Sequence, residues 1–345
     1  MVIYSKNTLQ KHKIGLIGFG KLARKNHVPT ILQHAQSELR LVHDVDQRVQ
    51  QALPPNVEFA SSLDDFLKTD LDAVVIATPN ETHASIAQKC IDRGLPVLLE
   101  KPLAETAAEG RDLVEKAKEL GVQLMVPHGW NYWNAASKTR TGISEGVIGQ
   151  LEVVNAHIIA PVRSSILSAH SGMGASPPST QGFLYTQMTH LLALLLHVTR
   201  ERFVEVQSYS QRFSSKSLEI GTTLSYRLEN GGIGTASGVA ISESSGKSNV
   251  SLDLYGDQGF IQIDSSCRRP LGNLGRLSDD WRGPADYPAE DPVKRFLDSV
   301  AGIDVEDPAP PVDLVHVLEC IEAAKRSEKS GRPEKILISQ NMRHL

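Results

Sequence analysis

The sequence predicts an α/β protein of two domains: a doubly wound parallel sheet, followed by an α+β domain with a large open, mainly antiparallel sheet. Three observations support this prediction. A glycine-rich turn follows the first short apolar run, apolar runs alternate with helical segments up to about residue 126, and later segments alternate polar and apolar residues between turns. The length of 345 residues also exceeds the size at which a single hydrophobic core usually stops growing.

The glycine-rich turn predicts a dinucleotide site. Residues 18–23 have the G-x-G-x-x-A spacing and follow the apolar run 14–17. Such a turn leads from a strand into a helix whose first amides can hold a pyrophosphate. Asp44 ends the next apolar run, where a carboxylate accepts hydrogen bonds from an adenosine ribose. The sequence therefore predicts a Rossmann domain. The alternative is a glycine turn that only packs a helix on the sheet.

Capping residues mark the other elements of this domain. Thr106 and Glu109 have the spacing of a capping box, in which each side chain satisfies a backbone amide of the other residue. The helix that follows and the helix at 82–93 should end at Gly121 and Gly94, because glycine suits a left-handed exit. The predicted strands are 14–17, 39–43, 73–77, 97–99 and 124–126.

After about residue 127 the pattern changes to alternating strands. These are predicted at 153–159, 203–213, 222–228, 234–241, 251–255 and 260–263. Helices are predicted at 187–199, 292–301 and 313–329, and a long loop, mobile or functional, at 164–180. The predicted organisation is an N-terminal extension 1–12, a dinucleotide-binding domain 13–127 and a second domain 128–345.

The composition argues against several classes of protein. The net charge is −4, the pI is about 6.3 and no basic stripe is present, so neither nucleic acid nor a membrane surface is an expected partner. The three cysteines lie far apart, and no histidines have metal-ligand spacing, so we expect no disulfide framework and no metal. The chain lacks an apolar signal core or a membrane-spanning run, which predicts a cytoplasmic protein.

Several further motifs follow the glycine turn in order. They are D-A-V-V-I-A-T-P-N at 72–80 with His83 following, E-K-P-L at 100–103, Gly182 with His190, Y-G-D-Q-G at 255–259, and L-E-C-I-E-A-A at 318–324 leading to S-G-R at 330–332. Together these motifs resemble the Gfo/Idh/MocA family of sugar oxidoreductases (glucose-fructose oxidoreductase and inositol 2-dehydrogenase), and the resemblance extends over about residues 13–338. This resemblance implies an NAD(P)-binding Rossmann domain. It also implies a second domain whose open sheet supports substrate on one side and, in many members, a partner subunit on the other. A homodimer or homotetramer is therefore expected.

The resemblance also implies the catalytic residues. Lys101 would lie near the nicotinamide and the substrate, and His190 would serve as acid and base. Histidine suits this role because alcohol oxidation releases a proton as hydride leaves, and an ammonium can stabilise a developing alkoxide. The alternatives are a solvated surface lysine and a core histidine bonded to backbone.

NAD is expected rather than NADP. A 2′-phosphate would meet the negative charges of Asp44 and Asp46, and no arginine is placed to receive it. The predicted cofactor-binding residues are Gly18, Phe19, Gly20, Lys21, Leu22, Asp44, Ala77, Thr78, Pro79, Asn80, His83, Glu100 and Lys101.

Two departures from the family pattern concern the substrate side. Thr186 stands where members usually carry an aspartate one turn before the histidine, and threonine cannot ionise. His128 begins a stretch where many members carry an arginine and then a proline. We expect either a proton route through His128 or Tyr132, a different substrate, or altered activity. Arg163 is a further candidate for binding an acidic substrate, with a surface ion pair as its alternative.

The leading hypothesis is an NAD-dependent oxidoreductase acting on a hydroxyl or ketone of a sugar, cyclitol or related polyol. Thr186, His128, Tyr132 and Arg163 are the predicted substrate-binding residues. One alternative is net non-redox chemistry, elimination or hydrolysis of a sugar with tightly held NAD. The other is a dinucleotide- or sugar-binding protein with altered catalysis.

Overall fold

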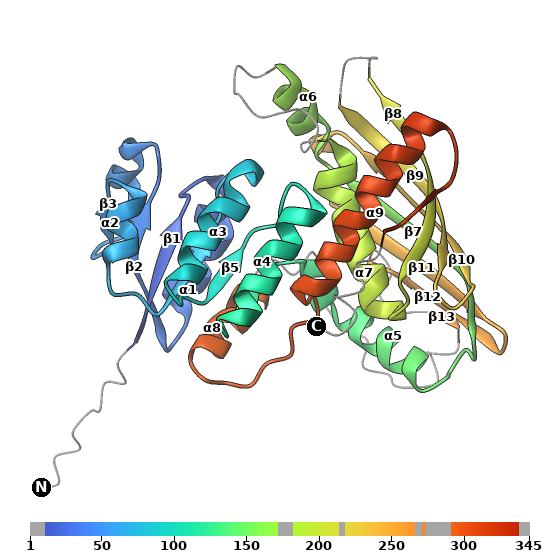
Figure 1. Cartoon of the computed structure of the whole chain (residues 1–345), viewed down its shortest axis with the longest axis horizontal. Coiled ribbons are helices and arrows are strands. Elements are labelled where there is room, and N and C mark those ends of the chain that lie inside the picture. The colour runs from blue at the N-terminus through green and yellow to red at the C-terminus, as the bar shows by residue number, and fades with distance from the viewer. Residues whose placement is uncertain (1–10, 172–181, 214–217, 266–270, 273–290, 338–345) are drawn as a thin grey trace, which may run out of the picture. The chain divides into compact units, whose positions relative to one another are not determined.

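The chain divides into two compact units. The computed structural model describes residues 11–171, 182–213, 218–265, 271–272 and 291–337. The first unit comprises residues 1–100, 113–127 and 289–307, and the second comprises 101–112, 128–288 and 308–345 (Figure 1). The sequence predicts a single boundary at residue 127. In the structure, residues 101–112 belong instead to the second unit, and residues 289–307 belong to the first.

The first unit contains a parallel sheet in the order β3-β2-β1-β4-β5-β6. The order reverses between β1 and β4, and ligands of open α/β sheets bind beyond the carboxyl ends of strands at such a point. Five strands agree with the prediction, whereas the sixth, β3, is too short to show a clear pattern. The strands are β1 (His12–Ile17), β2 (Ser37–His43), β3 (Glu58–Ala60), β4 (Ala73–Ile76), β5 (Val97–Leu99) and β6 (Leu124–Met125).

Helices cover both faces of this sheet. Ile14 of β1 packs in one buried cluster with Ile31 of α1, whereas Gly15 faces the other side. A Cβ at Gly15 would stand 2.4 Å from the ring of Phe66 in α2, so this close approach requires glycine. The helical elements are η1 (Ala23–His27), α1 (Val28–Gln33), η2 (Gln47–Ala52), α2 (Leu63–Lys68), η3 (Asn80–Thr82), α3 (His83–Asp92), α4 (Ala107–Glu119), which begins in the second unit, and α8 (Asp291–Val300).

Helix α8 belongs to the first unit, although the sequence placed this segment in the second domain. Val293, Phe296 and Leu297 are fully buried in the same cluster as Ile14. The i, i+3, i+4 spacing identifies an apolar helix face but does not say which sheet that face covers. In sequence, α8 follows most of the second unit, yet it packs on the first. A prediction that assigns each domain one continuous segment therefore misplaces it.

The predicted helix ends are confirmed. The amide of Glu109 donates to Oγ1 of Thr106 at 3.2 Å, and the amide of Thr106 donates to Oε2 of Glu109 at 3.2 Å. Gly94 and Gly121 have φ values of +72° and +63°, as a left-handed exit requires.

The second unit contains an eight-stranded sheet within the described residues, in the order β13-β12-β11-β7-β10-β9-β8-β14. Pairing is antiparallel except between β7 and β10, which run parallel. The sequence pattern shows which face of a strand is buried but not the direction of its neighbour. The strands are β7 (Leu151–Ala160), β8 (Phe203–Arg212), β9 (Glu219–Leu228), β10 (Ile233–Ala240), β11 (Asn249–Gly256), β12 (Gly259–Asp264), β13 (Leu271–Gly272) and β14 (Glu334–Lys335).

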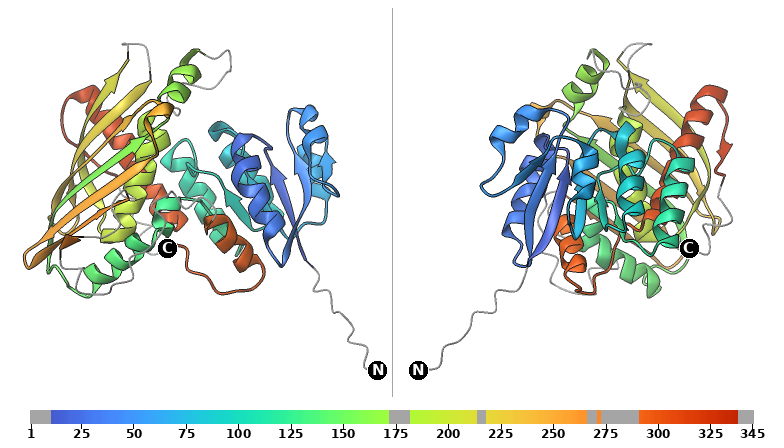
Figure 2. Two further views of the ribbon diagram at one scale, coloured as in Figure 1. Left: turned by 180° about the vertical axis from the view of Figure 1, so that it is seen from behind. Right: turned by 60° about the vertical axis from the view of Figure 1, so that its left-hand side comes forward.

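Helices α7 and α9 pack together and against this sheet (Figure 2). All of α7 is buried, because the sheet and neighbouring helices surround it. Residues 164–171, predicted as part of a loop, are helical in α6, and the rest of that predicted loop, residues 172–180, lies outside the described residues. The helical elements are η4 (Gly129–Tyr132), α5 (Asn134–Ser144), α6 (Arg163–Ser171), η6 (Leu184–Met188), α7 (Thr189–Thr199), η7 (Glu243–Ser245) and α9 (Pro311–Ser330). Within the described parts of the chain, none of the helices combines the length and apolar character needed to cross a bilayer.

The assignment of α8 can be tested by truncating its apolar face. Leu297→Ala should lower the free energy of unfolding by about 2 to 5 kcal/mol, because it opens a cavity in a filled core. Lys294→Ala, on the exposed face of the same helix, should change it by less than about 0.5 kcal/mol. Calorimetric unfolding of both variants provides the measurement. Equal effects would contradict the packing described.

Candidate functional site

The first unit holds the predicted pyrophosphate loop directly after β1. Gly18 has a φ of +92°, and its amide donates to the carbonyl of His43 at 2.8 Å. A Cβ at this position would stand 2.5 Å from the carbonyl oxygen of Ala77, which follows β4. Only glycine therefore permits this turn, and it brings the loops after β1 and β4 against each other at the switch point of the sheet.

Asp44 lies at the end of β2 and is tied to this loop. Its Oδ2 accepts from the amide of Phe19 at 2.7 Å, and its Oδ1 accepts from the amide of Asp46 at 2.8 Å. A carboxylate offers about four acceptor positions, so lone pairs remain for further donors such as ribose hydroxyls. The guanidinium of Arg48 donates to both carboxylate oxygens of Asp46, each at 2.8 Å. This pairing lowers the pKa of Asp46.

Gly20 fits a bound dinucleotide for a different reason. Its φ is not positive, and no atom of the described residues lies within 4 Å of the place where a Cβ would stand. The described part of the protein therefore does not require glycine at this position, whereas a diphosphate must come close to the backbone that binds it. Lys21 and Leu22 are exposed beside it, ahead of the helical turn that begins at Ala23.

The loop after β4 is held from behind by a histidine. Nε2 of His83 donates to the carbonyl of Thr78 at 2.9 Å, and the side chain is fully buried. His83 therefore supports the segment Thr78, Pro79 and Asn80 from inside the unit. The sequence predicted contact between His83 and the cofactor, and the geometry favours this supporting role.

Sequence reasoning missed a buried contact in the same unit. Glu100, predicted to line the nicotinamide side, has its Oε1 2.9 Å from Nε2 of His27 in η1. Both residues are buried. The available signal was the position of His27, which follows the buried Ala23 by one helical turn.

In the second unit, Lys101 and Thr186 are brought together from distant parts of the chain. The Nζ of Lys101 donates to the backbone carbonyl of Thr186 at 3.4 Å. Thr186 lies in η6, a π-helical turn, and such turns often occur at functional sites. Its hydroxyl donates to the carbonyl of Gly182 at 2.9 Å. That hydroxyl therefore keeps only its acceptor lone pairs for a substrate.

His190 lies at the start of α7, against His128. The two ring centroids are 5.2 Å apart in an edge-to-face arrangement, and the residues are 6% and 2% exposed. Burial lowers the pKa of His190 well below its usual value, and the Lys101 ammonium and His128 lower it further. A histidine with a lowered pKa is neutral at physiological pH, the state that can accept a proton from a hydroxyl.

Other predicted substrate-side residues lie in less suggestive surroundings. Tyr132 is buried in η4, and the rings of Trp130 and Trp133 pack edge to face 6.0 Å apart, which favours a packing role for the two tryptophans. The guanidinium of Arg163 donates to the carbonyl of Ala240 at 3.4 Å, so it helps to fasten α6 to the end of β10.

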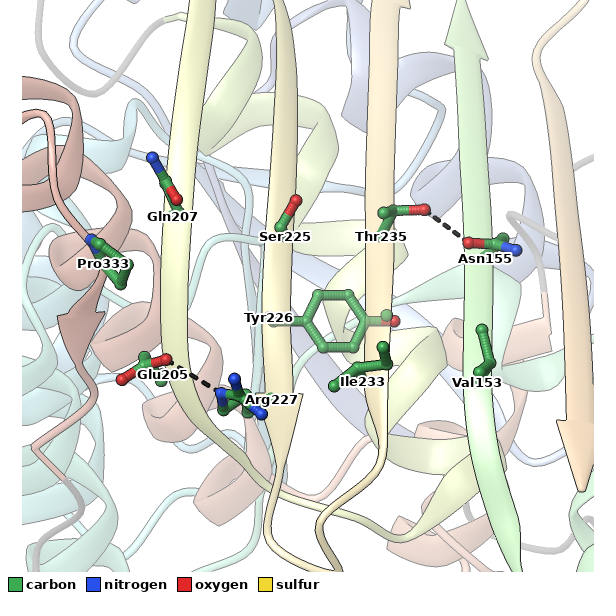
Figure 3. Close-up of a pocket in the computed structure, with 11 residues that line it drawn as sticks. Val153, Asn155, Glu205, Gln207, Ser225, Tyr226, Arg227, Ile233, Thr235 and Pro333 are labelled. Carbon is green, nitrogen blue, oxygen red and sulfur yellow. Dashed lines mark hydrogen bonds and ion pairs between the residues drawn. The ribbon is translucent and has the colours of Figure 1, made fainter.

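A separate cavity lies on the eight-stranded sheet. It has a volume of about 400 Å³ and is formed by strands β7 to β10 with Pro333. Figure 3 shows polar side chains along it, with an ion pair between Arg227 and Glu205 and a hydrogen bond from Thr235 to Asn155. No predicted site residue lines this cavity, so we do not assign the reaction to it.

No group of metal-ligating side chains gathers anywhere in the described ranges. Cys90 and Cys320 are buried free thiols, and burial raises the pKa of each to about 12. Cys267 lies outside the described residues.

The two glycines give a direct test of the dinucleotide site. Gly20→Ala should leave the melting temperature unchanged but weaken NADH binding, because its methyl group enters the space of the diphosphate and meets no protein atom. Gly18→Ala should instead destabilise the first unit by about 1 to 3 kcal/mol through backbone strain. Fluorescence titration with NADH and thermal unfolding measure the two effects. Unchanged affinity in Gly20→Ala would contradict the assignment.

Comparisons with known proteins agree with this architecture. The model of an oxidoreductase family with an NAD-binding Rossmann fold (GFO_IDH_MocA) matches residues 12–128, and the model of the GFO/IDH/MocA C-terminal domain matches residues 137–262. The solved structure of the WlbA dehydrogenase from Bordetella pertussis in complex with NADH and UDP-GlcNAcA is 22% identical, with a TM-score of 0.81 over 96% of this chain and 99% of that one. At this identity the likeness shows the fold alone.

Two curated relatives illustrate the range of the sequence matches. The uncharacterized oxidoreductase YdgJ of Escherichia coli is 32% identical over 42% of this chain and 42% of its own length. The NADP(+)-dependent scyllo-inositol 2-dehydrogenase IolW of Bacillus subtilis is 25% identical over 80% of this chain and 75% of its own length. The match to YdgJ thus spans about two fifths of that relative. With both family models matched in order on a six-stranded Rossmann sheet and an open mixed sheet, the chain belongs to the Gfo/Idh/MocA family of oxidoreductases.

Proposed function

We propose that the protein is an NAD-dependent oxidoreductase that moves hydride between a nicotinamide and a hydroxyl or ketone of a sugar, cyclitol or related polyol. The observation that carries this proposal is the cluster in the second unit, where Lys101, His128 and His190 come from three separate parts of the chain. The names of similar proteins, which include inositol dehydrogenases, support a sugar-like substrate.

The first unit supplies the proposed cofactor site. The amides of residues 20–22 would hold the diphosphate, and Asp44, which also fixes the turn through the amide of Phe19, would accept from the ribose hydroxyls. NAD is favoured over NADP because a 2′-phosphate would approach the carboxylate of Asp44. The two arginines nearest to it in sequence are both paired: Arg48 donates to both oxygens of Asp46, and Arg40 contacts Glu58 at 2.7 Å. One relative is named for NADP, so the ratio of the two affinities is the measurement that decides between the cofactors.

In the proposed mechanism His190 carries the proton of the reacting hydroxyl, and Lys101 stabilises the negative charge on its oxygen. The nicotinamide, when bound, accepts or returns the hydride. In oxidation, Nε2 or Nδ1 of the neutral His190 takes the hydroxyl proton while the C–H bond gives up its hydride. The Lys101 ammonium stabilises the negative charge that develops on the same oxygen. In reduction, His190 returns the proton to that oxygen.

Thr186 cannot hold a proton, so the route beyond His190 must differ from one that uses a carboxylate. The ring of His128 packs edge to face against the ring of His190, with centroids 5.2 Å apart, and an imidazole can carry a proton. We propose that His128 receives the proton from His190. Thr186 orients substrate only as a hydrogen-bond acceptor.

Self-association and location also remain proposals. We expect a homodimer or homotetramer that uses the open face of the eight-stranded sheet, the face on which the cavity of Figure 3 lies. Mass measurement in solution checks this expectation. The cytoplasmic location stays a prediction from the sequence.

Turnover can be followed by the absorbance of reduced nicotinamide with a panel of sugars and cyclitols. His190→Ala should lower kcat/KM by about 10² to 10⁴-fold, the usual contribution of a general acid or base, and Lys101→Met should also be severely impaired. His157→Gln changes a histidine bonded to Ser237 on the sheet and should have little effect. Turnover that survives both Lys101→Met and His190→Ala would rule out their roles.

The same experiment distinguishes the alternatives. Cofactor that copurifies, with product formed and no net reduction, would favour elimination or hydrolysis of a sugar. The other alternative, motivated by Thr186, is a binding protein with altered catalysis. It would be favoured if the protein binds nucleotide but turns over none of the substrates, and if replacing Lys101 has no effect.

The pKa of His190 tests its electrostatic surroundings. The pKa should lie below the ordinary value of 6.5, so the ring stays neutral as pH falls through that value and protonates only at lower pH. Lys101→Met removes a positive neighbour and should raise the pKa, whereas Lys247→Met, which changes an exposed lysine, should not. NMR titration of the imidazole provides the measurement. A pKa at or above 6.5 in the unmodified protein would contradict this account.

A further inference from the structure

The first unit contains a buried contact between the imidazole of His27 and the carboxylate of Glu100. Nε2 of His27 and Oε1 of Glu100 are 2.9 Å apart, and the two residues are 1% and 8% exposed. Neither ring nitrogen of His27 is in hydrogen-bond geometry with any described residue. The 2.9 Å separation places the imidazole and the carboxylate in ion-pair contact, and buried polar atoms in native proteins are nearly always paired.

The backbone explains why this ring points inward. The amide of Val28 donates to the carbonyl of Ala23, which makes η1 a π-helical turn. Ala23 and His27 are both buried, so they share the inner face of the helix that follows the pyrophosphate loop. Glu100 follows β5, and its amide donates to the carbonyl of Ile76 in β4 at 2.9 Å. The contact therefore joins the pyrophosphate helix to the carboxyl end of the sheet.

The charge of Glu100 matters at this place. The carboxyl edge of the strands is where the diphosphate of a dinucleotide lies in Rossmann domains. A buried carboxylate is costly unless donors compensate it. Removing the imidazole would leave Glu100 less compensated and would favour its turning toward solvent at this edge. There its negative charge would oppose an anionic diphosphate.

We propose that His27 is a positioning residue of the dinucleotide site, which holds the Glu100 carboxylate inside the first unit and away from the diphosphate. This inference rests on the proposed function, because it assumes that the first unit binds a nicotinamide dinucleotide. It concerns the affinity for that dinucleotide and is independent of the substrate.

The test is fluorescence titration of the full-length protein with NADH. His27→Ala should raise the Kd by about tenfold or more, the scale of losing a partner of a buried charge. His27→Gln, which keeps a donor, should stay within about threefold of the unmodified protein. His34→Ala is the matched control, because His34 contacts Asp298 at 3.1 Å in the same unit. It should lower the melting temperature and change the Kd by less than about twofold. If His27→Ala does not fold, His27→Leu fills the same space and replaces it.

A double substitution separates charge from packing. Because Glu100 is itself a predicted cofactor-binding residue, Glu100→Gln alone is the reference. In that background His27→Ala should recover most of the affinity that it costs in the unmodified protein, because no carboxylate remains to oppose the diphosphate. A merely structural role of His27 predicts no recovery. The proposal is overturned if His27→Ala binds NADH within about twofold of the unmodified protein, if His34→Ala weakens binding as much, or if the double variant shows no recovery. Failure of the unmodified protein to bind NADH would instead overturn the proposed function, and this inference with it.

Discussion

The close approach of Gly18 to the carbonyl of Ala77 is the constraint on which the first unit depends. It requires a residue without a Cβ, and it sets the loop after β1 against the loop after β4. Asp44 then fixes the same turn by accepting from the amide of Phe19. No atom of a described residue lies within 4 Å of the place where a Cβ on Gly20 would stand, so the space above this part of the turn is open. The geometry of the turn, held by Asp44, thus leaves room for a diphosphate.

Two π-helical turns lie beside the residues of the candidate site. In η1 the turn brings His27 to the buried side, against Glu100. In η6 it presents the carbonyl of Thr186 to Lys101, directly ahead of His190. Each turn adds one residue to the helical register, and each lies next to a segment that the reaction would use. Glu100, the partner of His27, directly precedes Lys101 in the chain.

Much of the fold could be predicted from the sequence, because the signals were local. The capping box at Thr106, the glycine exits and five strands of the first sheet each depend on a few adjacent residues. The place of α8, the parallel pairing of β7 with β10 and the helix α6 depend on partners far away in the chain, which periodicity does not identify. At the candidate site, Asp44, Lys101 and His190 were predicted from motifs. His27 was missed because a buried histidine has no signature until its partner Glu100 is known.

The most direct test of the account is a crystal structure of the protein with NAD bound. We expect the diphosphate on the amides of residues 20–22, the adenosine ribose on Asp44, and C4 of the nicotinamide facing Lys101 and His190. A complex in which C4 faces away from both side chains, or in which the diphosphate lies elsewhere, would contradict the central claim that this backbone turn delivers a redox ring to an ammonium and an imidazole.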